Sequence, residues 1–210
     1  MSFRTGRGRA GKGRILRFFV YTSYPSAELF VNGKSYGKQR KLTADESRAL
    51  EGQDSLALQR RYRLMWMDVP YEPGEVKVVA YDASGKPAEE KVIRTAGKPH
   101  HLELVADRTR LSADGKDLAY ITVRVVDKDG NLCPADSRMV NFSVKGAGKY
   151  RAAANGDATS LDLFHLPKMP AFSGQLTAIV QSGEQAGEIV FEARAKGLKS
   201  GKLVLYTSEK

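Results

Sequence analysis

Several residue types and segments are scarce in this chain of 210 residues, and each scarcity excludes a class of protein. A single cysteine, Cys133, rules out a disulfide bond within the chain. No stretch approaches the ~18 consecutive apolar residues that a membrane-spanning helix needs, so we expect no membrane partner. The first residues are basic but lack the apolar core of a secretory signal. The single cysteine and the three histidines have no spacing typical of a metal site, and we expect no cofactor.

Positive charge is concentrated at the start of the chain. The net charge is +10, and residues 1–17 contain six arginines and lysines but no acidic residue, which leaves +4 for the other 193 residues. We expect this basic segment to be a disordered arm. Such an arm can contact phosphate groups, but Phe3 is its only aromatic residue for stacking on bases. Nucleic-acid binding is therefore the least favoured function.

Strand patterns dominate the remainder of the sequence. Residues 17–23 are rich in β-branched and aromatic side chains, and residues 62–69 alternate between two faces. The pair Asn32-Gly33 is typical of the two-residue turn of a β-hairpin. Strand and turn patterns recur roughly every 8–12 residues, which is the signature of a β-sandwich. Strands do not alternate with helical segments, which excludes a (β/α)₈ barrel and a doubly wound sheet.

The sequence therefore predicts an all-β fold with two immunoglobulin-like β-sandwich domains in tandem. The segment AGKP at residues 96–99 has the composition of a linker. We place the domains at residues 18–96 and 97–210, after the arm at 1–17. Residues 42–59 contain helix formers and no strand alternation, so we expect a loop with a short helical turn at the edge of the first sandwich.

Three long motifs resemble one enzyme family. They are AELFVNGKSYGK at residues 27–38, YRLMWMDVPYEPGEVKVVAYDASGK at 62–86 and LELVADRTRLSADGKDLAYITVRVVDKDGN at 102–131. In this order they are similar to the region that follows the catalytic barrel in the sequence of bacterial β-galactosidases of glycoside hydrolase family 2. The resemblance covers about residues 19–206. The second half is also similar to the immunoglobulin-like repeats of invasin-type adhesins.

This resemblance implies a non-catalytic tail, structural or weakly carbohydrate-binding. Retaining glycosidases use two carboxyl groups about 5–5.5 Å apart, and the family carries them on a barrel of ~250 residues that this chain cannot contain. We expect no catalytic residue here, and Asp68 and Glu72 are best interpreted as strand-edge and turn carboxylates. The expected partners are the catalytic domains of a parent glycosidase and, in addition, polysaccharide. The parent is expected to be periplasmic or secreted by a bacterium. The alternative is a cell-surface invasin-type binding module without an attached enzyme.

Three aromatic residues are candidate carbohydrate contacts: Trp66, Tyr62 and Tyr71. Exposed rings bind sugars through their apolar faces. A tryptophan inside a strand is more often part of a sandwich core, and that interpretation is favoured for Trp66, with contact to a missing domain as a third alternative.

A long loop over residues 159–173 is the candidate surface for a partner, with Phe164, His165 and Phe172 as its contacts. Loops on rigid scaffolds often carry function. Just before it, Asn155-Gly156-Asp157 offers oxygen ligands that Ca²⁺ prefers, but lacks the regular spacing of a calcium loop. A turn stabilised by the side chain of Asp157 is favoured there.

Overall fold

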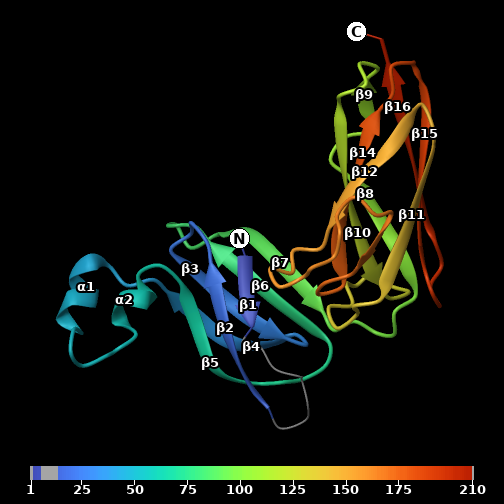
Figure 1. Cartoon of the computed structure of the whole chain (residues 1–210). Helices are drawn as coiled ribbons and strands as arrows, with labels where there is room; N and C mark the ends of the chain where they lie inside the picture. Colours follow the sequence, from blue (N-terminus) through green and yellow to red (C-terminus); the bar gives the residue numbers. More distant parts are fainter. Residues whose placement is uncertain (1, 6–13, 210) are drawn as a thin grey trace. The chain divides into compact units, whose positions relative to one another are not determined.

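The structure is a computed structural model that describes residues 2–5 and 14–209 (Figure 1). It divides into two compact units, the first ending at Thr95 and the second beginning at Ala96. Each unit is a mainly antiparallel β-sandwich of the immunoglobulin-like kind, so the all-β fold predicted from the sequence is confirmed. The helices of the described residues are too short to cross a membrane.

In the first unit, a three-stranded and a four-stranded sheet contribute to one apolar core. Alternate residues such as Phe18, Leu29 and Val78 fill this core, because successive side chains of a strand point to opposite faces. The three-stranded sheet has the order β1 (Ser2–Thr5), β2 (Ile15–Tyr21) and β5 (Leu64–Pro70), and the four-stranded sheet has the order β4 (Lys34–Arg40), β3 (Ser26–Val31), β6 (Glu75–Tyr81) and β7 (Pro87–Arg94).

The start of the chain differs from the disordered arm expected over residues 1–17. Ser2–Thr5 forms β1 and pairs antiparallel with β2, which itself begins at Ile15. The pairing satisfies backbone N–H and C=O groups that would otherwise lie on a free edge of β2. The expectation is therefore wrong for residues 2–5 and 15–17. Residue 1 and residues 6–13 of the expected arm lie outside the described residues.

The segment between β4 and β5 contains two short helices, where the sequence predicted a loop with one helical turn. They are α1 (Ala44–Ala49) and α2 (Ala57–Arg60). The Thr43 hydroxyl accepts the N–H of Glu46 at 3.2 Å, and the Glu46 carboxylate accepts the N–H of Thr43 at 2.8 Å. This capping box stabilises the first turn of α1, and the Thr43–Glu46 spacing is the signal that sequence analysis missed.

The Asn32-Gly33 turn was predicted correctly, and it also ties two loops of the first unit together. Asn32 has φ of 49° and Gly33 has φ of 81°, as a hairpin turn of this type requires. The Asn32 amide donates to the carbonyl of Pro73 at 3.1 Å, and its Oδ1 accepts the N–H of Glu75 at 2.8 Å. A Cβ at Gly74 would lie 1.9 Å from this Oδ1, so the contact requires glycine there.

In the second unit, a four-stranded and a five-stranded sheet contribute to a larger core. Phe191 lies in its centre and stacks on Phe142 at 5.8 Å between ring centroids. The first sheet has the order β12 (Gly148–Ala154), β14 (Gln175–Ser182), β10 (Leu118–Val126) and β8 (His101–Ala106), and the second has the order β13 (Lys168–Pro170), β11 (Met139–Gly146), β15 (Gly187–Ala195), β16 (Gly201–Ser208) and β9 (Arg110–Ser112).

A buried carboxylate, Asp127, organises the start of the second unit. Its Oδ2 accepts the N–H of Gly97 at 2.7 Å, and its Oδ1 accepts the N–H groups of Asp129 and Asn131, each at 2.9 Å. The Gly97 N–H contributes most to lowering the pKa of Asp127, followed by the Asn131 side chain, and together these donors hold it at about 2. The free thiol of Cys133 is buried nearby, 3.8 Å from the Gly97 carbonyl, and this burial raises its pKa.

We expect the second unit to lose stability in acid partly through Asp127. The folded pKa of about 2 lies below the ordinary value of 3.8, so the stabilisation is fully present above about pH 4 and is lost as the pH falls towards 2. Urea unfolding followed by circular dichroism between pH 7 and 2.5 measures this loss. The variant Asp127→Asn is expected to be less stable at pH 7 and to lose less further stability in acid. Parallel pH profiles for the two proteins would contradict this role.

Candidate functional site

The structure places Trp66 in the core of the first unit. Its side chain is 4% exposed, and its Nε1–H donates to the carbonyl of Gly37 at 3.1 Å. A sugar cannot stack on a ring that is covered by the protein, so the candidate carbohydrate contact at Trp66 is wrong. Sequence analysis favoured the core for Trp66, but its alternation placed Asp68 on the same face as Trp66 and Val69 on the other. In the structure a register shift between β2 and β5 follows Trp66, so Val69 lies in the core with Trp66 and Asp68 is exposed.

The two tyrosines near Trp66 in sequence have different surroundings. Tyr62 is 62% exposed after α2, and the Arg61 guanidinium lies 5.4 Å from the centre of its ring. Tyr71 is half-buried just beyond β5, and its N–H donates to the carbonyl of Arg14 at 2.7 Å. With Trp66 buried, the three residues do not form a shared aromatic surface. A sugar contact at Tyr62 or Tyr71 alone stays a prediction.

The loop between β12 and β13, residues 155–167, is held to the sandwich through its backbone. The Tyr150 hydroxyl lies 2.7 Å from the carbonyl of Leu166 and 3.1 Å from that of Phe164, so its single hydrogen can be donated to either carbonyl. Burial raises the pKa of Tyr150 to about 12, so this hydroxyl stays protonated at neutral pH. The N–H of Ala153 also donates to the Phe164 carbonyl, at 2.8 Å. The end of the loop is therefore fixed against β12.

Large apolar side chains of this β12–β13 loop face solvent. Leu161 is 95% exposed, Phe164 is 59% exposed, and Leu163 is similarly open. His165 is exposed beside them, while Phe172 is partly exposed in the separate connection between β13 and β14, where its N–H donates to the carbonyl of Gln175. Sequence analysis singled out Phe164, His165 and Phe172 but missed both leucines. The signal was LDLF at residues 161–164, an apolar group outside any strand.

The turn at the start of this loop has the contacts expected of a turn. The Asp157 carboxylate accepts the N–H of Thr159 at 2.9 Å and its hydroxyl at 2.7 Å, and both contacts lower the pKa of Asp157. The Asn155 side chain donates to the carbonyl of Pro170 at 3.1 Å. Across the described residues, no group of three or more histidine, cysteine or acidic side chains is arranged to hold a metal ion.

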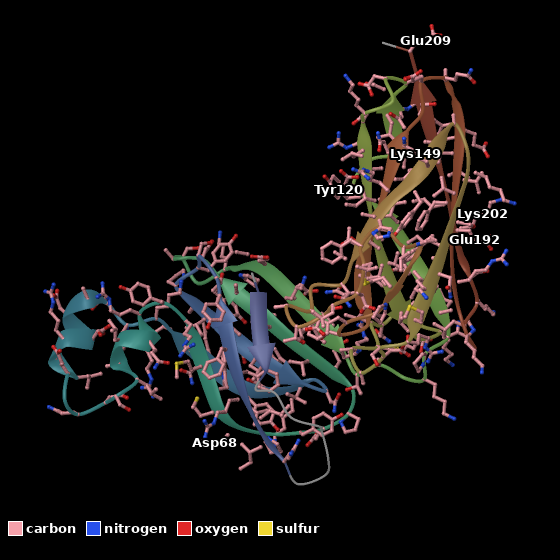
Figure 2. The ribbon with its side chains drawn as sticks, viewed as in Figure 1. Asp68, Tyr120, Lys149, Glu192, Lys202 and Glu209 are labelled. Atoms are coloured by element: carbon pink, nitrogen blue, oxygen red, sulfur yellow. The ribbon has the colours of Figure 1, made fainter. Side chains whose placement is uncertain are left out.

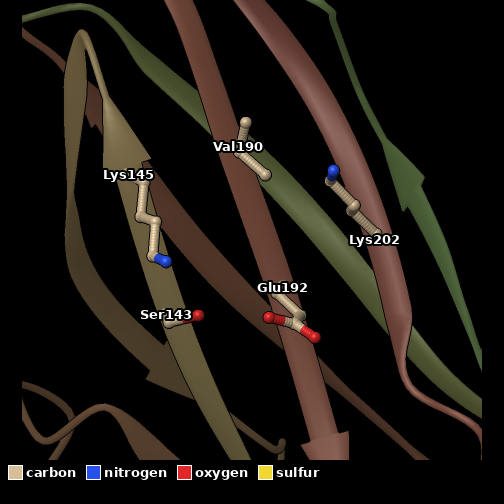
Figure 3. Close-up of a pocket in the computed structure, with 5 residues that line it drawn as sticks. All are labelled: Ser143, Lys145, Val190, Glu192 and Lys202. Carbon is tan, nitrogen blue, oxygen red and sulfur yellow. The ribbon is translucent and has the colours of Figure 1, made fainter.

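A depression of about 340 Å³ lies on the outer face of the five-stranded sheet, and sequence analysis did not find it. Figure 3 shows Ser143 and Lys145 on β11, Val190 and Glu192 on β15, and Lys202 on β16 around it. Arg194 donates twice to Glu192, at 2.8 and 2.9 Å, and this contact lowers the pKa of Glu192, with further lowering from Lys145 and Lys202. Glu192 is therefore an ionised acceptor and unsuited to donating a proton as a general acid.

Comparisons with known proteins fit the tandem sandwich defined by these two units. Residues 102–204 match the family model for glycoside hydrolase family 2 C-terminal domain 5, and residues 13–89 match a domain of unknown function (DUF4982). The chain is 39% identical over 189 residues to a β-galactosidase of Bacteroides ovatus, which covers 90% of this chain and 20% of that protein. It is 24% identical over 179 residues to a β-galactosidase of Thermoanaerobacter pseudethanolicus, covering 85% of this chain and 22% of that protein.

A solved family 2 glycosyl hydrolase from Bacteroides cellulosilyticus has the same fold in its matching part. The TM-score is 0.80 at 30% identity, and the match covers 97% of this chain and 24% of that chain. The chain therefore belongs to glycoside hydrolase family 2, as a C-terminal region. It spans about a fifth of the length of the β-galactosidases that it matches. The alternative of an invasin-type module is not favoured, because the family model over the second unit is that of a glycoside hydrolase domain.

Proposed function

We propose that this chain is a non-catalytic accessory region that packs against the catalytic region of a family 2 glycosidase. The observation that carries the proposal is the β12–β13 loop, which presents Leu161, Leu163 and Phe164 to solvent while Tyr150 fixes its backbone. Fully burying one such side chain stabilises a contact by about 1.5–3 kcal/mol. Exposed apolar groups on a fixed loop are typical of an interaction site.

The lengths of the relatives indicate which polypeptide the β12–β13 loop contacts. The match to the Bacteroides ovatus β-galactosidase covers 20% of that protein, and the matched family model describes a C-terminal domain. Most of the relative is thus polypeptide outside the matching region. We propose that the loop docks onto that polypeptide, in the parent of this chain as in the relative.

The chemistry of the described carboxylates supports a non-catalytic role. Glycoside hydrolysis uses a pair of carboxyl groups, one of which must be protonated to act as the acid. Glu192 is the one carboxylate of the depression on the five-stranded sheet, and it is held ionised by Arg194. The sugar-cleaving step then belongs to the catalytic region of the parent.

A chimeric enzyme tests the docking. The matching region of the Bacteroides ovatus β-galactosidase is replaced by this chain, and the thermal midpoint of activity is compared with that of the enzyme truncated before the region. We expect the chimera to be the more stable protein. The double variant Leu161→Asp/Phe164→Asp is expected to remove most of the gain, because it places charge in an apolar contact.

The matched control is Val105→Asp, which adds charge at an exposed residue of β8 away from the loop and is expected to keep the gain. Circular dichroism of the isolated chain checks that the loop variant still folds. Equal stability of the chimera and its loop variant would exclude this loop as the contact. A truncated enzyme as stable and active as the chimera would exclude the accessory role altogether.

A further inference from the structure

The outer face of the five-stranded sheet gathers cationic side chains from strands far apart in sequence. The register places Lys168, Asn141 and Arg194 in one row across β13, β11 and β15, and Ser143, Glu192 and Lys202 in the next across β11, β15 and β16. Two further rows complete the face, one with Lys145 opposite Val190 and one with Tyr206 between Glu188 and Arg110. Its charged members are the cations Lys145, Lys168, Arg194, Lys202 and Arg110 and the carboxylates Glu188 and Glu192. We call this surface the cationic face.

Most of the positive charge on the cationic face is available to a ligand. Arg194 and Glu192 neutralise each other through their two hydrogen bonds. Among the residues that the structure describes, Lys145 and Lys202 form no ion pair within 4.0 Å, although both act on Glu192 at longer range. Figure 2 shows Glu192 and Lys202 on the side of the second unit opposite Tyr120. The two ammonium groups therefore border the depression as unneutralised charges (Figure 3).

The same face carries neutral groups that suit a hydroxyl-rich ligand. Ser143 lies opposite Glu192 across the strands, and Asn141 lies opposite Arg194. The ring of Tyr206 is 50% exposed on β16, between Glu188 and Arg110 in register, and can stack on an apolar sugar face. The depression of about 340 Å³ is within the ~300–1,000 Å³ typical of ligand sites.

We propose that the cationic face binds an acidic polysaccharide whose sugars carry carboxylate groups. Lys145 and Lys202 would contact the carboxylates, Ser143 and Asn141 would hydrogen-bond to hydroxyl groups, and Tyr206 would stack on a ring. Asn141, Ser143 and Glu188 distinguish this ligand from duplex DNA, because a sugar chain offers them hydroxyl groups along its length and the backbone of duplex DNA does not. The binding does not depend on docking of the β12–β13 loop, so either proposal can fail alone.

Polygalacturonate, a linear polyuronate, is the probe for this face. Binding to the 210-residue chain is measured by isothermal titration calorimetry at low and at physiological salt, and is expected to be saturable and weaker at the higher salt. Lys145→Gln/Lys202→Gln is expected to weaken it at least tenfold, and Tyr206→Ala severalfold. The matched control Lys128→Gln/Lys149→Gln removes the same charge from exposed lysines outside the face and is expected to change the affinity less than twofold.

Three further probes separate the ligand classes. Neutral dextran is expected not to bind, and dextran sulfate and duplex DNA are expected to bind more weakly than polygalacturonate. Tighter binding of dextran sulfate would overturn the assignment to carboxylate-bearing sugars, and tighter binding of DNA would overturn the assignment to polysaccharide. No saturable binding, or binding equal in the Lys145→Gln/Lys202→Gln variant and the control, would overturn the site. Circular dichroism verifies that each variant is folded.

Discussion

Replacing Trp66 with alanine is expected to destabilise the first unit by about 3–5 kcal/mol, the range for removing a large buried aromatic side chain. The ring is almost fully covered by the core of the first unit, and its Nε1–H satisfies the Gly37 carbonyl of β4. The variant therefore leaves both a cavity and an unpaired carbonyl. Hydrogen exchange measured by mass spectrometry is the suitable readout, because it resolves peptides of residues 14–95 from those of 96–209.

Two further variants separate the cavity from the hydrogen bond. Trp66→Phe keeps most of the apolar volume but removes the N–H donor, and a loss of about 1 kcal/mol is expected. Tyr62→Ala changes an exposed ring and is expected to alter stability by less than about 0.5 kcal/mol. Protection of the first unit that survives Trp66→Ala would show that Trp66 is not part of its core.

Phe191→Ala is expected to cost the second unit about 3–5 kcal/mol in unfolding free energy. Phe191 is fully buried in β15 and stacks on Phe142, which in turn stacks on Tyr150 at 5.8 Å. The variant thus loosens the support of the Tyr150 hydroxyl that holds the β12–β13 loop. Urea unfolding followed by circular dichroism measures the loss, and hydrogen exchange is expected to show faster exchange at Ala153 and in β12.

The matched control for this variant is Val105→Ala, which shortens an exposed side chain on the outer face of the other sheet. Its expected effect is below about 0.5 kcal/mol. An equal effect of the two substitutions would contradict the central place of Phe191 in the core.

The sequence predicted the fold because strand patterns are local. The Asn32-Gly33 turn depends on neighbours within a few positions, and it appears in the structure. The pattern over residues 62–69 correctly indicated a strand, β5, although a register shift after Trp66 breaks its alternation of faces. The sequence predicted one helical turn where the structure has α1 and α2, because each helix is only one to two turns long, too short for a helical period to show. The capping box at Thr43 was the better signal there.

The candidate sites were harder to predict because they depend on which face of a strand is buried and on register. Alternation grouped Trp66 with Tyr62 and Leu64, yet the structure buries Trp66 and Leu64 and exposes Tyr62, which lies before β5 begins. The cationic face joins β11, β15 and β16 through pairings such as Glu192 with Lys202. No local pattern contains such a pairing, so the sequence alone could not assemble this surface.

The most direct test of the central claim is the rate of aryl β-galactoside hydrolysis by three preparations before and after a heat step. They are this chain alone, the truncated Bacteroides ovatus β-galactosidase, and the chimera that joins them. We predict no turnover by the chain alone, although circular dichroism shows it folded, and a chimera that keeps its activity at a temperature where the truncated enzyme loses it. Turnover by the purified chain, or equal heat survival of the truncated enzyme and the chimera, would contradict the account.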